Sequence, residues 1–177
     1  MKIRYGFVSN SSSSSFIIAW KEIDEKELKN KFNIEIMSII NNFDDIITYD
    51  TLFELFLNKN PNYDINQKNN EFKFNVYFSG QYLKIRYIPK ENKFEIYAPE
   101  TVSWSDTIKI GEVTPKKALL FWADIPLSVE DIDEKIQEED YYYSDFSESD
   151  FYDDIQEKIK EFEKIGAEVY WDIGRDG

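Results

Sequence analysis

The feature that most constrains the fold is a stretch between positions 72 and 98 in which apolar and polar residues alternate. Successive side chains of a β-strand point to opposite faces, so a period of two indicates half-buried strands. Three such runs occur, and their apolar members are Phe72, Phe74, Val76 and Phe78, then Leu83, Ile85 and Tyr87, then Phe94, Ile96 and Ala98. Ser79-Gly80-Gln81 supplies a tight turn after the first run. The pattern predicts an antiparallel meander within residues 71–111, to which residues 107–110 add a short strand.

The flanking segments carry helical patterns and further strands. Residues 1–20 predict a β-hairpin with a serine-rich loop, and residues 24–57 predict helices, the first opened by a capping box at Asp24 and Glu27. Residues 114–166 predict an acidic helical region that closes at Gly166. Within it, Thr114-Pro115 fits the start of a helix, but residues 118–122 also fit a buried strand. Residues 167–177 predict a terminal strand.

These elements predict an α+β fold in a single domain, residues 1–177. An antiparallel β-meander packs against helices, with an N-terminal β-hairpin and a C-terminal helix plus strand. We expect the apolar side chains of the meander to pack against the last helix, whose apolar stripe is Ile155, Ile159, Phe162 and Ile165. The meander residues expected in this core are Phe74, Val76, Phe78, Leu83, Ile85 and Phe94.

Composition excludes several kinds of chemistry. The chain has 177 residues and contains neither Cys nor His. Disulfides, thiol catalysis, thiolate or imidazole metal sites and a His-centred triad are therefore excluded. No apolar run approaches the length that spans a bilayer, and the N-terminus lacks the apolar core of a signal peptide. We expect a cytoplasmic protein that needs no cofactor and does not bind a membrane.

Negative charge is concentrated in one segment. Residues 130–154 hold 12 acidic residues and one lysine, which gives −11 of the formal net charge of −14. Tyrosine and phenylalanine residues are interleaved with these acids. The candidate partner-binding residues in this segment are Glu138, Glu139, Asp140, Tyr142, Asp145, Phe146, Glu148 and Asp150.

Three interpretations of the acidic segment stay open. The acids can simply form the solvated face of helices. They can bind a divalent cation, although Asp145-x-x-Glu148-x-Asp150 lacks the turn glycine of a calcium loop. They can also form a contact surface for a basic protein, with carboxylates in the place of phosphates and aromatic rings as anchors. Direct nucleic-acid binding is not expected, because a chain at −14 repels phosphates and Lys116-Lys117 and Lys84-x-Arg86 are too small to form a patch.

A serine run near the N-terminus is the second candidate functional element. It comprises Ser9, Asn10, Ser11, Ser12, Ser13, Ser14 and Ser15, between two apolar segments. The run can be a plain hairpin loop, an anion-binding loop, or a recognition or modification element with several accessible hydroxyls. It lacks the glycine and lysine that a phosphate-binding P-loop requires.

The string Gly6-Phe7-Val8-Ser9-Asn10, followed by five serines and Phe16, resembles an N-terminal signature of uncharacterised small proteins of phages and low-GC bacteria. The resemblance covers about a tenth of the chain and implies a phage or prophage setting, with the host cytoplasm as the place of action. It attaches no catalytic residue to the chain.

These observations together favour a protein that works by binding. The concrete expectation is an acidic inhibitor of a host nucleic-acid-handling protein, similar to an anti-CRISPR protein and directed against a basic partner such as an RNA-guided nuclease. One alternative is a nucleotide-modifying or ribosyl-transferring enzyme with the serine run at its site. A second alternative is a structural phage protein.

Replacement of the serines tests the role of the run. If it is a recognition or modification element, changing Ser11, Ser12, Ser13 and Ser14 to Ala leaves the melting temperature nearly unchanged and abolishes partner binding, because exposed loop hydroxyls contribute little to folding. Thermal unfolding and a binding assay with the same preparation measure both. Unchanged binding would reduce the run to a spacer.

Overall fold

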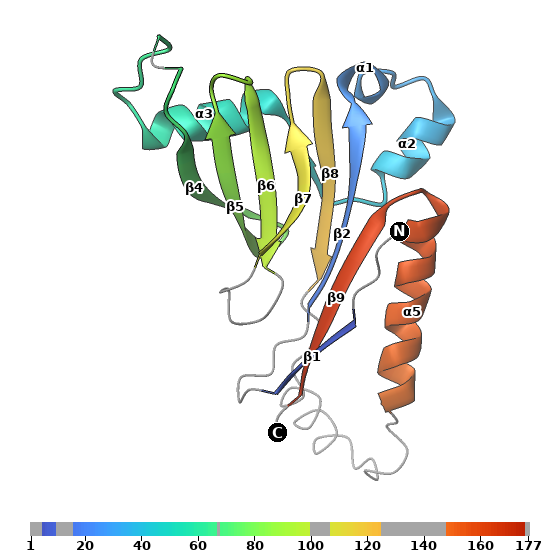
Figure 1. The fold of residues 1–177 in the computed structure, drawn as a ribbon. Coiled ribbons are helices and arrows are strands. Elements are labelled where there is room, and N and C mark those ends of the chain that lie inside the picture. The colour runs from blue at the N-terminus through green and yellow to red at the C-terminus, as the bar shows by residue number, and fades with distance from the viewer. Residues whose placement is uncertain (1–4, 10–15, 67, 100–106, 125–147, 176–177) are drawn as a thin grey trace.

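A computed structural model describes residues 5–9, 16–66, 68–99, 107–124 and 148–175 (Figure 1). The chain order of the elements is β1 (Tyr5–Ser9), β2 (Phe16–Asp24), α1 (Glu25–Leu28), α2 (Ile34–Ile40), β3 (Asp45–Ile47), α3 (Tyr49–Lys59), β4 (Phe72–Phe78), β5 (Gln81–Ile88), β6 (Lys93–Pro99), β7 (Thr107–Val113), β8 (Lys117–Asp124), α5 (Glu148–Lys164) and β9 (Glu168–Arg175). The α+β class with an antiparallel meander is confirmed.

The strands form two sheets. Sheet B is the predicted meander, with the order β4-β5-β6-β7 and antiparallel neighbours throughout. Its register places Val76 opposite Leu83 and Ile85 opposite Ile96, so apolar side chains meet on one face. Ser79 and Gly80 both have positive φ, 48° and 77°, which is the conformation of a two-residue hairpin turn whose twist matches that of the strands.

Sheet A joins segments from both ends of the chain, in the order β1-β9-β2-β8-β3. The two N-terminal strands form as expected, but they pair through β9 rather than directly with each other. β9 runs parallel to β1, with Tyr5 opposite Trp171, and antiparallel to β2, with Ile18 opposite Tyr170. The C-terminal helix plus strand is likewise confirmed, and its strand takes an inner position in the sheet.

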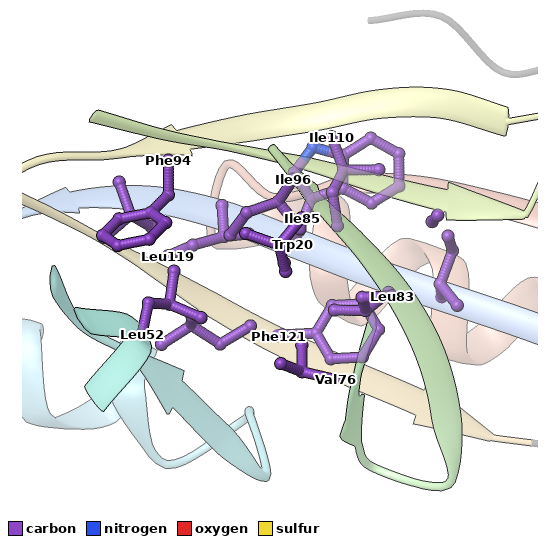
Figure 2. Close-up of a cluster of buried hydrophobic side chains, with 14 of the residues drawn as sticks. Trp20, Leu52, Val76, Leu83, Ile85, Phe94, Ile96, Ile110, Leu119 and Phe121 are labelled. Carbon is purple, nitrogen blue, oxygen red and sulfur yellow. The ribbon is translucent and has the colours of Figure 1, made fainter. Parts of the chain in front are cut away.

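The main core lies between the facing sides of the two sheets (Figure 2). Trp20 and Phe121 from sheet A meet Leu83 and Ile85 from sheet B in this layer. Helix α3 adds Leu52 and Phe56, both fully buried, and Phe56 packs against Tyr87 with ring centroids 4.7 Å apart. The helices predicted within residues 24–57 thus include α3, which contributes to this main core.

A second core covers the other face of sheet A. Ile159 and Phe162 of α5 are buried there, 4% and 1% exposed, against strand residues such as Leu120 and Val169. The prediction that this helix packs on the meander was therefore wrong. The apolar face of sheet B is already filled by sheet A, so α5 covers the apolar face of sheet A that remains.

Of the meander residues assigned to the core, Val76, Leu83, Ile85 and Phe94 are buried, but Phe74 and Phe78 on the edge strand β4 are only partly buried. An edge strand has a neighbour on one side alone, so its side chains keep contact with solvent.

The end of α5 follows the predicted glycine stop. The amide of Gly166 donates to the carbonyl of Glu163, and the amide of Ala167 donates to the carbonyl of Phe162, at 3.0 Å each. This is the Schellman pattern, and Gly166 occupies its left-handed position with φ of 74°. The turn directs the chain from α5 straight into β9.

One local prediction was wrong. The helix predicted to open with a capping box at Asp24 is only the short α1, which ends at Leu28, and the side chain of Asp24 makes no capping hydrogen bond. Helix α2 begins anew because the side chain of Asn33 accepts hydrogen bonds from the amides of Glu35 and Ile36. The break leaves Phe32 98% exposed.

Of the two alternatives left open for residues 118–122, the buried strand is confirmed, and Thr114-Pro115 opens no helix. Thr114 and Lys117 close a tight turn through two backbone hydrogen bonds, and the apolar run that follows is the strand β8. Because β8 lies between β2 and β3 and both faces of sheet A are covered, nearly all of its side chains are apolar.

The turn between β7 and β8 also carries the chain from sheet B to sheet A, and Glu22 of β2 links the two sheets at this seam. One oxygen of its carboxylate accepts a hydrogen bond from the amide of Glu112 at 3.1 Å, and the other lies 3.0 Å from the ammonium of Lys117. A Cβ on Gly111 would come within 2.9 Å of Leu119 and 3.3 Å of Glu22, so the close approach of β7 requires glycine there.

The main core between the two sheets should contribute most of the free energy of unfolding. Phe94 is fully buried and stacks on Tyr87 at 4.5 Å, so Phe94→Ala is expected to lower the free energy of unfolding by about 3–5 kcal/mol. The matched control is Tyr77→Ala, which removes a ring that is 59% exposed and should cost less than about 1 kcal/mol. Urea unfolding of both variants measures the difference. Equal losses in the two variants would contradict this assignment of the core.

Candidate functional site

The residues selected from the sequence lie mostly outside the described parts of the chain. Glu138, Glu139, Asp140, Tyr142, Asp145 and Phe146 fall there, as do Asn10 and Ser11, Ser12, Ser13, Ser14 and Ser15. Ser9 is the last residue of β1, and Glu148 and Asp150 belong to the first turn of α5, where only the backbone is described. The structure therefore leaves both sequence-based sites as predictions.

The structure brings together a different set of polar residues, on the outer face of sheet B. We call this set the charged face. It comprises Lys73, Asn75, Tyr77, Tyr82, Lys84, Arg86, Lys93, Glu95, Tyr97, Lys109 and Glu112. These side chains alternate with the buried residues of the same strands, so the apolar packing on one side of the sheet fixes their direction on the other. Lys73, Asn75 and Lys84 are exposed.

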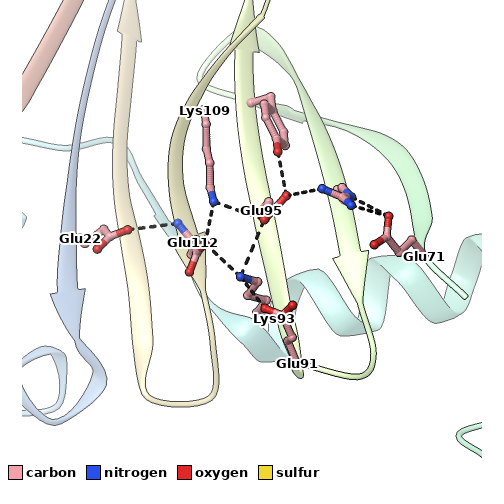
Figure 3. A network of polar contacts seen from close by, with 9 residues as sticks. Glu22, Glu71, Glu91, Lys93, Glu95, Lys109 and Glu112 are labelled. Atoms are coloured by element: carbon pink, nitrogen blue, oxygen red, sulfur yellow. Dashed lines mark hydrogen bonds and ion pairs between the residues drawn. The ribbon is translucent and has the colours of Figure 1, made fainter. Parts of the chain in front are cut away.

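Glu95 organises the centre of the charged face (Figure 3). It is only 7% exposed, although it lies on the outer side of the sheet. One of its oxygens accepts hydrogen bonds from the hydroxyl of Tyr97 at 2.7 Å and from Arg86 at 3.1 Å. The other accepts from the ammonium of Lys109 at 3.3 Å. The carboxylate thus holds three neighbours, from its own strand and from both adjacent strands, in fixed positions.

Two further carboxylates complete the network. Glu71 accepts from two nitrogens of Arg86, at 2.9 and 2.5 Å, and orients the guanidinium from the side opposite to Glu95. Glu112 accepts from Lys109 at 2.6 Å and from Lys93 at 3.2 Å. The cations at the centre of the face are therefore held in place by their partners rather than free to rotate in solvent.

The network shifts the pKa values of its acids. Burial by itself raises the pKa of Glu95, but hydrogen bonds from Tyr97 and Lys109 outweigh it, and the pKa lies below its ordinary value. The pKa of Glu112 is lowered as well, chiefly by the hydrogen bond from Lys109. Both pKa shifts favour the ionised carboxylates, which is the form that binds the surrounding cations.

A hollow of about 560 Å³ opens beside this network. Polar side chains from all four strands of sheet B line the hollow, together with Glu71, which directly precedes β4. The strand residues are Lys73, Asn75, Lys84, Arg86, Tyr97 and Thr107. Of all the lining side chains, three are cationic and one is anionic, so the lining has a formal charge of +2 in a chain whose total is −14. Such a lining suits an anion that also accepts hydrogen bonds.

Sequence reasoning missed this site because it judged each basic pair alone. Lys84-x-Arg86 is small in the sequence, but strand pairing sets Lys73 opposite Arg86 and Lys84 opposite both Asn75 and Tyr97. The signal was present in the period-two alternation. Once the apolar residues of the three strands are assigned to one face, the intervening basic and tyrosine residues share the other.

Comparisons with known proteins add no assignment, since no family model, no curated protein and no solved structure matches the chain. Within the described ranges, acidic side chains form no group that could hold a metal ion. In the same ranges no helix is long and apolar enough to cross a membrane.

The network predicts a pH-dependent effect of Glu95. A carboxyl whose pKa is lowered by folding stabilises the protein above its unfolded pKa, and this stabilisation is lost as the pH falls through the folded pKa. Glu95→Gln is therefore expected to cost about 1–3 kcal/mol at about pH 7, and the cost should shrink below about pH 4.

Urea unfolding at several pH values measures this cost. Glu91→Gln is the matched control, because Glu91 is exposed and contacts only Lys93 among the described cations, at 2.6 Å. A Glu95→Gln variant with the same pH profile as the wild type would show that the network contributes nothing to folding.

Proposed function

We propose that this protein works by binding a basic protein, through the acidic segment at residues 130–154. The observation that carries the proposal is the uneven distribution of charge, with −11 in this segment and −3 in all the rest of the chain. Surface charges contribute little to folding one by one, so their concentration in a single segment favours a role in recognition. A dense negative surface attracts a basic partner over a long range and accelerates association.

The composition of the segment supports contact rather than mere solubility. Tyr142 and Phe146 lie among the acids, and aromatic residues supply much of the binding energy at protein interfaces. Carboxylates beside aromatic rings resemble the phosphates and bases of a nucleic-acid strand. The partner favoured by this chemistry is a protein with a positively charged groove for nucleic acid, which the segment would occupy.

The fold supports the proposal by anchoring one end of the segment. Its last residues belong to α5, which continues to Lys164, and Ile159 and Phe162 fix that helix to sheet A. The Schellman turn at Gly166 then ties α5 to β9 in the middle of the sheet. An anchored end reduces the entropy that binding has to remove, which favours affinity.

In its most specific form, the proposal is that the protein inhibits a host nucleic-acid-handling protein such as an RNA-guided nuclease, in the manner of an anti-CRISPR protein. The phage-like signature at the N-terminus supports this setting. The host cytoplasm is then the place of action.

The salt dependence of association tests the acidic segment. A variant in which Glu138, Glu139, Asp140, Asp145, Glu148 and Asp150 are changed to Gln or Asn has a net charge of −8. It is expected to associate about tenfold more slowly with an immobilised, guide-free RNA-guided nuclease at low salt, and to show a flatter salt dependence. Surface-plasmon kinetics at about 50 and about 300 mM salt measure both effects.

A matched control separates the segment from the total charge. Neutralising six exposed acids elsewhere, Glu27, Asp44, Glu54, Glu157, Glu163 and Glu168, also gives −8. The control should keep most of the wild-type association rate, since these acids are spread over several elements. Equal slowing in both variants, or wild-type association that does not change with salt, would contradict the proposal.

A further inference from the structure

The hollow on the charged face has a chemical preference that the acidic segment does not explain. Its only lining carboxylate among the described residues, Glu71, is engaged by two nitrogens of Arg86. Lys73 is exposed and has no ion-pair partner in the described parts of the chain, and it borders the hollow together with the amide of Asn75 and the hydroxyl of Thr107. Lys73 can therefore donate to a ligand, and the side chains of Asn75 and Thr107 can donate as well as accept.

The register places two lysines close enough to share one anionic group. Lys73 lies directly opposite Arg86, and Lys84 is two residues before Arg86 on the same strand. Lys73 and Lys84 are thus diagonal neighbours on one face, a separation that long side chains can bridge. A phosphate held between the two ammonium groups would also lie near the guanidinium of Arg86, which Glu71 and Glu95 hold rigidly.

An aromatic ring stands in the wall of the same hollow. Tyr97 lies directly opposite Lys84, and its hydroxyl is tied to Glu95 at 2.7 Å, which fixes the ring beside the cations. Tyr77 of β4 and Tyr82 of β5 form an exposed aromatic pair, with ring centroids 4.7 Å apart, nearer the turn that joins these two strands. A planar base can stack on such rings, and each stacked base contributes about 1–3 kcal/mol.

We propose that this hollow binds a free mononucleotide, with the phosphate between Lys73 and Lys84 and the base against Tyr97. A volume of about 560 Å³ lies in the usual range for small-molecule sites. The negative net charge of the protein favours the binding of a single nucleotide over that of an oligonucleotide. One phosphate meets the local +2 of the lining, but each further phosphate of an oligonucleotide meets the field of a protein at −14. The inference is independent of the acidic segment and stands on sheet B alone.

Titration with defined probes tests the site on the full chain. Calorimetry and amide chemical shifts are followed with AMP, ribose 5-phosphate, inorganic phosphate and a single-stranded oligoadenylate. AMP should bind and shift amides of β4, β5 and β6. Ribose 5-phosphate should bind more weakly than AMP because it lacks the base, and inorganic phosphate more weakly still.

Paired variants locate the binding. Lys73→Ala with Lys84→Ala should weaken AMP binding about tenfold or more, and both side chains are exposed, so folding should be retained. The control is Lys31→Ala with Lys160→Ala, which removes two exposed lysines outside sheet B and gives the same net charge of −16. The control should bind AMP like the wild type.

Three results would overturn the inference. The first is an absence of AMP binding to the wild type, and the second is equal weakening in both double variants. The third is an oligoadenylate that binds tighter than AMP, which would assign the charged face to single-stranded nucleic acid instead.

Discussion

The passage of the chain from sheet B to sheet A at the turn between β7 and β8 is the constraint on which the rest of the structure depends. Three residues, Thr114, Pro115 and Lys116, connect β7 of sheet B to β8 of sheet A, so the two sheets lie against each other at this turn. The carboxylate of Glu22 binds both sides of the seam, and Gly111 allows the close approach. With the two sheets held together here, the apolar face of sheet B packs on one face of sheet A, and α5 covers the other face of sheet A.

The charged face follows from that packing. Because the inner side of sheet B is apolar apart from Gln81, the period of two sends the intervening polar residues of its strands to the outer side. Lysine and tyrosine residues that are scattered over more than thirty positions of the sequence thereby become neighbours. Glu95 then turns this collection into an ordered site, since it binds Arg86, Tyr97 and Lys109 at once. The order of the charged face therefore comes from side chains on the strands themselves.

Local patterns predicted the elements well and their partners poorly. The alternation in β4, β5 and β6, the helix α3 and the glycine stop at Gly166 depend on nearby residues, and all were predicted from the sequence. The insertion of β9 between β1 and β2, and the choice of sheet A as the partner of α5, depend on which apolar faces are still uncovered when all elements are present. The charged face was missed for the same reason, because its residues meet only through strand register.

The place of β9 has a consequence for how the chain folds during synthesis. The strands of sheet B are consecutive, so the meander can form while later residues are still being translated, and its contacts are short in sequence. Sheet A is different, because in the described part of the chain β1 pairs only with β9, which starts more than 150 residues after it. Until the ribosome has released β9, β1 has no pairing strand and one edge of β2 is unpaired. Strand β1 and one edge of β2 are therefore without their partner strand for most of synthesis, and chaperones can reach them throughout that time.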